Sequence, residues 1–174
     1  LGFHAALDSD YGWAEHAELF GAQFDSHPKG AGSGEARMLV EDRTSPITAG
    51  WKGKSSFMLD DEYYRWRTAK RIPDVSLPRN APDTHVLLSL DEGTVGGDIQ
   101  KGPIAYEHHQ PIAWTKTFRN KGRVYYNNMG HSDSTWTDPA FRTSLTNGVD
   151  WVSQVRPDAK CLAGTGSVAS NPKP

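Results

Sequence analysis

Cysteine is almost absent from this sequence. The only one, Cys161, excludes an internal disulfide bond and a metal site built from several thiolates. Long apolar runs are missing too, so we expect no segment that spans a membrane. A surplus of basic residues is also lacking, since the net charge at pH 7 is -2. This argues against nucleic acid as a partner, because such binding depends on clustered lysine and arginine side chains.

The residues that are present fit one loop-rich folded domain. The 174 residues include 17 glycines and 11 prolines, and 36% of the chain is hydrophobic, which is enough to bury a sizeable core. Six tryptophans and six tyrosines are many for this size, and aromatic rings stack against sugars as well as filling cores. The chain starts at Leu1 without methionine. We therefore expect a removed leader or missing N-terminal sequence, and predict a secreted or extracytoplasmic protein.

A β-hairpin followed by a helix is the clearest pattern in the chain. Residues 111–118 and 123–128 have the composition of strands, and a polar turn at 119–122 joins them. His131 follows the second strand directly after a glycine. A helix is predicted over 138–154, because a proline suits its first turn and apolar residues recur along one face.

Further strands and a helix are predicted before and after residues 70–83, a proline-containing segment expected to lie on the surface. Strands are expected at 35–40, 55–66 and 85–90, where apolar residues cluster. Residues 12–24 have helical spacing, although Gly21 disfavours the second half of that helix. After residue 155 the composition turns to glycine, serine, alanine and proline, which predicts a linker, with a further domain of a larger chain beyond it.

Several ionisable side chains fall near the ends of the predicted strands. Ligands of α/β sheets collect at such ends, so His131 is the reference point of the predicted site. Glu62 stands in an aromatic run, where a carboxyl group can act as a general acid or base; the alternative is an exposed residue on a strand edge. His4 ends a strand among small residues, which would let a ligand approach closely; the alternative is a histidine hydrogen-bonded at the rim of the sheet.

Three further polar residues have two interpretations each. Asp8 either orients His4 or caps the helix predicted after it. His27 precedes Pro28, which holds it extended, and it either faces a ligand or lies in a surface turn. Asp91 follows a predicted strand, where it either faces a cleft or belongs to an acidic turn.

A set of short segments, in a fixed order, covers the chain from Leu1 to about residue 155. They are Gly2-Phe3-His4-Ala5-Ala6 with Asp8 and Tyr11, Ser26-His27-Pro28, Asp61-Glu62-Tyr63-Tyr64, Leu90-Asp91-Glu92, Pro111-Ile112-Ala113-Trp114, Gly130-His131, and Asp138-Pro139-Ala140-Phe141-Arg142. In this order the set resembles the ThuA-like (trehalose-utilisation) domain. No single segment is specific to that family.

The resemblance implies an α/β fold similar to class I glutamine amidotransferases. That fold is a flavodoxin-like three-layer sandwich, with a parallel sheet between helices; here it is expected to be incomplete at the N-terminus and to carry an antiparallel hairpin near the C-terminus. The resemblance implies a domain over residues 1–155 and a tail over 156–174. Amidotransferases place a nucleophilic cysteine on a sharp strand-to-helix turn, and His4 occupies the matching position, which removes thiolate chemistry.

The same resemblance links the chain to the utilisation of disaccharides, with a small carbohydrate as partner. The main hypothesis is a carbohydrate-active enzyme of the hydrolase or isomerase type, and the alternative is a noncatalytic carbohydrate-binding module of a larger secreted protein. Acid–base roles are assigned to His4, Glu62 and His131. A divalent metal held by His4 and His131 is a variant of this hypothesis. The expected substrate-binding residues are Asp8, His27, Tyr63, Asp91 and Trp114.

Overall fold

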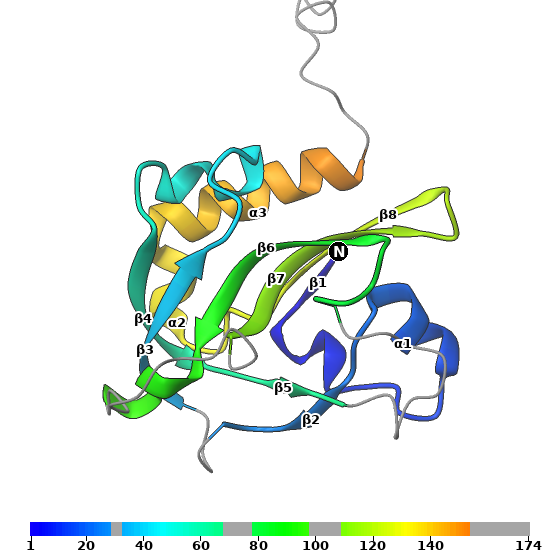
Figure 1. Cartoon of the computed structure of the whole chain (residues 1–174), viewed down its shortest axis with the longest axis horizontal. Coiled ribbons are helices and arrows are strands. Elements are labelled where there is room, and N and C mark those ends of the chain that lie inside the picture. Colours follow the sequence, from blue (N-terminus) through cyan, green and yellow to red (C-terminus); the bar gives the residue numbers. More distant parts are fainter. Residues whose placement is uncertain (29–32, 68–77, 98–108, 154–174) are drawn as a thin grey trace, which may run out of the picture.

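The structure is a computed structural model that describes residues 1–28, 33–67, 78–97 and 109–153. The expected tail over 156–174 and Cys161 lie outside these residues. A six-stranded sheet forms the centre of the domain (Figure 1). In spatial order its strands are β1 (Gly2–Phe3), β8 (Gly122–Asn127), β7 (His109–Phe118), β6 (Thr84–Asp91), β3 (Ser33–Val40) and β4 (Ser56–Glu62). A separate two-stranded ribbon pairs β2 (Phe24–Ser26) with β5 (Arg65–Trp66).

The strand directions differ from the parallel sheet that the resemblance implies. Among the described strands of the central sheet, β1 and β8 pair in parallel, while the other four pairings are antiparallel. The fold is therefore mixed α/β. Parallel neighbours need a long crossover connection, whereas β7 and β8 are joined by a tight turn that can only produce antiparallel strands.

The predicted hairpin is confirmed by the pairing of β7 with β8. Its turn contains Arg119 and Asn120 at φ values of 48° and 58°. The Lys121 N–H closes this turn by donating to the Phe118 carbonyl at 3.0 Å. Two successive positive φ values are typical of the turn whose twist matches that of paired strands.

Helices cover both faces of the sheet (Figure 1). The α-helices are α1 (Ala14–Phe20), α2 (Asp133–Thr137) and α3 (Pro139–Val152), and the 3-10 helices are η1 (His4–Leu7), η2 (Pro46–Trp51) and η3 (Glu92–Gly97). The predicted C-terminal helix is confirmed as α3, whose N-cap Asp138 accepts hydrogen bonds from two backbone N–H groups of the first turn. Helix α1 ends at Phe20, and its C-cap Gly21 adopts a left-handed φ of 81°. No helix among the described residues has the length and apolar character needed to cross a membrane.

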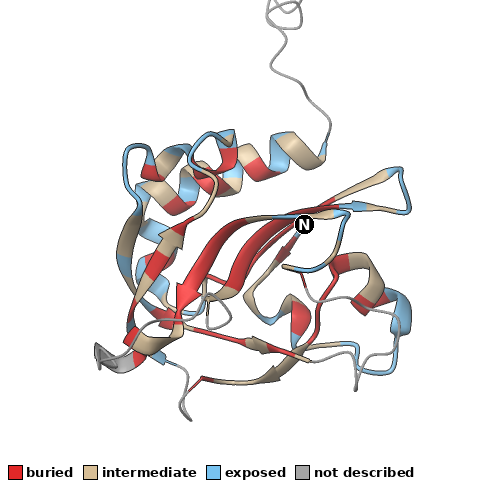
Figure 2. Ribbon diagram, viewed as in Figure 1, coloured by how far each residue is buried: buried red, intermediate tan, exposed pale blue. Residues whose placement is uncertain are grey.

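The core lies on both sides of the central strands, which Figure 2 shows as mostly buried. One cluster lies between the sheet and the layer of α3 and η2, and includes Met38, Leu88 and Tyr125. The other lies toward α1 and includes Trp114 and Tyr126. Neighbouring residues of β8 enter opposite clusters because side chains alternate along a strand.

Close packing between α3 and β8 predicts that replacing Gly148 destabilises the fold. A Cβ atom at Gly148 would lie 2.2 Å from Cδ1 of Tyr125. The Tyr125 ring cannot move away freely, because its hydroxyl is bonded to Ser144 at 2.8 Å and to Asn127 at 2.9 Å. We expect Gly148→Ala to lower the free energy of unfolding by roughly 1–3 kcal/mol in urea denaturation, despite the better helix propensity of alanine. The control is Gly12→Ala, where nothing lies within 4 Å of the new Cβ; equal stability of the two variants would contradict the packing argument.

Candidate functional site

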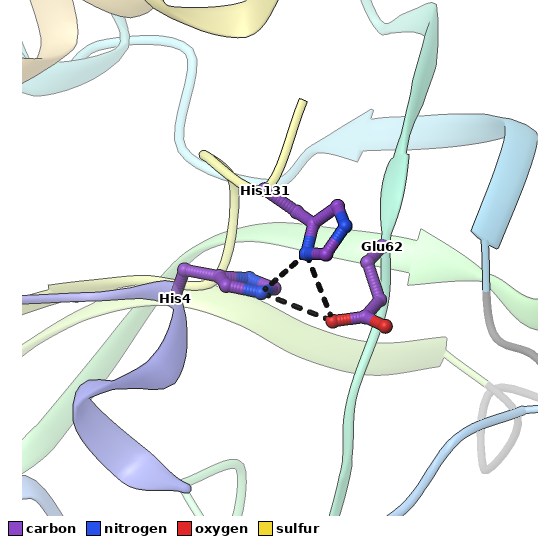
Figure 3. A group of neighbouring side chains, drawn as sticks. All are labelled: His4, Glu62 and His131. Atoms are coloured by element: carbon purple, nitrogen blue, oxygen red, sulfur yellow. Dashed lines mark hydrogen bonds and ion pairs between the residues drawn. The ribbon is translucent and has the colours of Figure 1, made fainter. Parts of the chain in front are cut away.

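Three side chains from distant parts of the chain converge at one place (Figure 3). His4 follows β1, Glu62 ends β4, and His131 follows β8. His4 Nε2 lies 3.1 Å from Glu62 Oε2 and 3.3 Å from His131 Nδ1, which in turn lies 3.3 Å from the same carboxylate oxygen. Since β1 and β4 are the two edge strands of the central sheet, this contact requires the sheet to curl until its edges approach each other.

The backbone fixes the orientation of the His4 ring. His4 has a φ of 40° where β1 gives way to η1, a conformation that costs a non-glycine residue about 1–3 kcal/mol unless its surroundings hold it. Its carbonyl oxygen accepts a hydrogen bond from the Tyr126 hydroxyl at 2.8 Å. Its Nδ1 lies 2.8 Å from the Asn128 carbonyl oxygen and donates to it, so that Nε2 faces Glu62 and His131.

The His131 loop is held by the buried carboxylate of Asp61. This carboxylate accepts hydrogen bonds from the backbone N–H groups of Gly130, His131 and Ser132 at 2.8–2.9 Å, and from the Thr135 hydroxyl at 2.8 Å. Hydrogen bonds to a charged acceptor are the stronger kind, and a buried carboxylate needs several of them. Because Asp61 directly precedes Glu62, the contacts that position His131 also position the end of β4.

Tyr64 closes one side of the cluster. Its hydroxyl lies 3.1 Å from His4 Nε2, and its backbone N–H donates to the Asn128 side chain at 3.0 Å. Burial, followed by the charges of Glu62 and Asp8, raises the pKa of Tyr64. The phenol therefore stays protonated and offers a hydrogen-bond donor to the ring of His4.

His27 joins the cluster from the loop after β2. Its Nδ1 donates to the Tyr63 carbonyl oxygen at 3.0 Å, and its Nε2 lies 3.7 Å from Glu62 Oε1. Asp8 stands nearby: it accepts a hydrogen bond from the Tyr11 hydroxyl, and its charge contributes to the raised pKa of Tyr64. The structure thus brings His4, Glu62 and His131 together, with His27 and Asp8 close to them.

The remaining expected substrate-binding residues lie in the interior. Tyr63 is buried and donates its hydroxyl to the Leu59 carbonyl oxygen at 2.6 Å. Asp91 is buried and forms an ion pair with Arg37. Trp114 is fully buried, and its indole N–H donates to the Phe20 carbonyl oxygen at 2.8 Å. The aromatic candidate for the sugar falls in the core because helices cover both faces of the sheet, so the middle of β7 is buried on both sides.

Sequence reasoning missed four residues that build the site. These are Asp61, Tyr64, Asn128 and Trp136. Trp136 remains 43% exposed, and its indole N–H donates to the Gly130 carbonyl oxygen at 2.9 Å, so an accessible ring stands beside the His131 loop. A signal existed for Asp61, since consecutive acids at residues 60–62 inside an apolar run imply a partner for any carboxylate that is buried. Tyr64 belongs to the quoted segment that contains Glu62, whereas nothing local marked Asn128 or Trp136.

Replacing the carboxylate of Asp61 with an amide should release the His131 loop. In Asp61→Asn, at least one amide N–H would face backbone N–H donors, so we expect the free energy of unfolding to fall by about 2–4 kcal/mol in urea denaturation. Asp60→Asn is a matched control, because Asp60 is the exposed neighbour. Equal stability of both variants would show that the Asp61 contacts do not hold the loop.

The fold and the site define a mixed α/β domain with a histidine–carboxylate cluster where a curled sheet brings its edges together. The family profile described as ThuA, trehalose utilisation, matches residues 1–152. The chain belongs to the ThuA family, which is linked to trehalose utilisation.

Two solved structures are similar to this chain. A ThuA-like protein from Bacteroides uniformis ATCC 8492 is 26% identical, with a TM-score of 0.58 over 87% of this chain and 56% of that one. A ThuA-like protein from Parabacteroides merdae ATCC 43184 is 18% identical, with a TM-score of 0.57 over 88% of this chain and 60% of that one. The chain thus spans less than two thirds of the length of either structure. No curated protein matches it.

Proposed function

We propose that this domain processes a small carbohydrate by acid–base chemistry, with a disaccharide or an oxidised disaccharide as substrate. The observation that carries the proposal is the convergence of two imidazoles and a carboxylate within 3.1–3.3 Å of one another. The link between the ThuA family and trehalose utilisation supports a sugar as the substrate class. Exchange of a proton with a sugar hydroxyl suits histidine, which titrates near neutral pH.

Exposure assigns different roles to the three side chains. The side chain of His131 is 54% exposed, whereas those of His4 and Glu62 are 12% and 17% exposed. His131 is therefore the group that meets the sugar and exchanges the proton. Glu62 balances the charge that this exchange creates on the imidazole. His4 is the orienting group, because its ring is fixed through Asn128 and Tyr64.

Trp136 takes the role of sugar platform in this proposal. Its ring packs edge-on against Phe141 and Phe3, at centroid distances of 5.2 and 6.3 Å, so it is held in place while part of it stays accessible. A fixed aromatic ring beside a proton-exchanging histidine supports stacking of a pyranose over the site.

The amidotransferase-like assignment of the fold is also part of this proposal. Two features support it: the parallel pairing of β1 with β8, and the strained φ of His4 where β1 turns into η1. A sharp turn of this kind presents a side chain at a strand end. With histidine rather than cysteine at the turn, the proposed chemistry is proton transfer and not thiolate attack. An extracytoplasmic location stays a prediction of the sequence.

A noncatalytic carbohydrate-binding module is the second candidate function. The exposed rings of Tyr11, Trp13 and Trp136 favour it, since accessible aromatics bind sugars without any chemistry. Binding of a labelled sugar with no turnover, and with no effect of replacing His131, would support this candidate over the enzyme.

Removal of the acid–base groups should strongly reduce turnover. We expect His131→Ala and Glu62→Gln to lower kcat by about 10²–10⁴-fold on any disaccharide that the native protein converts, because proton transfer then lacks its partner. Product formation from a panel of disaccharides and their oxidised forms is measured, with His85→Ala as the control for loss of a histidine elsewhere. Unchanged kcat in the His131 variant would end the acid–base proposal.

Loss of the Trp136 ring should affect sugar binding more than chemistry. We expect Trp136→Ala to raise KM about tenfold, which corresponds to about 1.4 kcal/mol, with little change in kcat. Trp13→Ala removes a similarly exposed ring from the start of α1 and serves as the comparison. A KM that responds equally to both substitutions, or to neither, would contradict a platform at Trp136.

A further inference from the structure

We infer that His4, Glu62 and His131 are the ligands of one divalent transition-metal ion of the zinc or manganese type. The inference rests on the proposed function in that it concerns the same three side chains, and it names the cofactor that this site would use. It goes beyond acid–base chemistry because a bound ion would polarise a sugar oxygen directly.

The spacing of the three donor atoms fits an ion between them. The separations are 3.1, 3.3 and 3.3 Å among His4 Nε2, Glu62 Oε2 and His131 Nδ1. A zinc ion with bonds of about 2.0–2.1 Å in tetrahedral geometry spaces its donor atoms roughly 3.3–3.4 Å apart. The three atoms therefore form a nearly equilateral triangle of the size of one tetrahedral face. The slightly shorter edges of an octahedral face fit as well.

The hydrogen positions also favour a cation at this point. When His4 is neutral and Nδ1 donates to the Asn128 carbonyl oxygen, Nε2 presents a lone pair. Glu62 Oε2, another acceptor, lies only 3.1 Å away. The Tyr64 hydroxyl, 3.1 Å from Nε2, donates to this nitrogen from another side and places no proton between Nε2 and Oε2. The two facing lone pairs therefore repel each other unless a proton or a metal ion lies between them. A metal ion would accept from all three donor atoms together.

The surroundings have the form of an outer shell that orients metal ligands. A ligating histidine characteristically donates its other ring N–H to a carbonyl or carboxylate group, as His4 does to Asn128. The His131 loop is fixed by the carboxylate of Asp61. His27 Nε2 lies 3.7 Å from Glu62 Oε1, the carboxylate oxygen that would not bind the ion. This contact helps to orient the carboxylate so that Oε2 faces the two histidines.

The donor set decides which ions fit. Two imidazole nitrogens and one carboxylate oxygen suit zinc, manganese or iron, whereas magnesium and calcium prefer oxygen donors throughout. Three protein ligands leave at least one coordination position open, which is the arrangement of catalytic rather than structural metal sites. The exposed side of the cluster, at His131, is where a sugar oxygen would reach that position.

Direct metal titration without sugar tests the inference. Full-length protein, stripped with chelator and dialysed, is titrated with Zn²⁺ and separately with Mn²⁺ in a calorimeter. We expect one ion per chain for at least one of the two metals, with affinity at least about 100-fold weaker in His131→Ala and Glu62→Gln. Asp61→Asn, which removes an outer-shell contact, should weaken binding by about 10–100-fold. Circular dichroism verifies that each variant is folded.

His85→Ala is the matched control for histidine removal. Its side chain is 63% exposed, similar to that of His131, but His85 lies on β6 and pairs with Asp42, which is not part of the cluster. Metal affinity equal to the native value in this variant supports the inference. Absence of binding of both metals, or equal affinity in the His131 and His85 variants, would overturn it. Sugar turnover that survives chelation but is lost in His131→Ala would overturn the metal-site inference and leave the proposed acid–base function standing.

Discussion

The buried carboxylate of Asp61 is the interaction on which the site depends. It accepts hydrogen bonds from three consecutive backbone N–H groups, at residues 130–132, and from the hydroxyl of Thr135. Without these donors the carboxylate would be an isolated buried charge, and without the carboxylate the loop would leave three N–H groups unpaired. Each therefore stabilises the other. Because side chains alternate along a strand, the residue after Asp61 points elsewhere, and Glu62 reaches the ring of His131.

A second constraint is the break after Glu62, where the chain leaves the central sheet. The segment expected as one strand over 55–66 is divided into β4 and β5, which belong to different sheets, and Tyr63 and Tyr64 stand at the break. The break turns the first ring into the core and places the hydroxyl of the second beside His4. A straight strand would have kept both residues in the regular alternation of one sheet. The curl of the sheet then brings its two edge strands together, so that side chains separated by 58 residues come within hydrogen-bond distance.

Local patterns were sufficient to predict much of this molecule, and long-range pairing was not. The hairpin, the C-terminal helix and the strand over 84–91 follow from alternation, turn residues and capping, which act over a few positions. Strand order and direction depend on contacts that no local pattern encodes. The same limit explains the site. His4, Glu62 and His131, predicted at strand ends, do lie together. Trp114, predicted to contact the sugar, is buried, whereas Trp136 beside the His131 loop stays exposed, because the packing of helices on both faces decides which tryptophan is accessible.

The central claim is that the Asp61 carboxylate holds the His131 loop in the one arrangement that completes the cluster. Amide hydrogen exchange at residues 130–132, followed by NMR, tests it most directly, because these N–H groups lie next to an exposed histidine and yet are all donated to a buried acceptor. The account predicts that exchange at these positions is far slower than in an unprotected peptide. It also predicts that this protection is lost at all three positions together in Asp61→Asn. Exchange at the unprotected rate in the native protein would contradict the account.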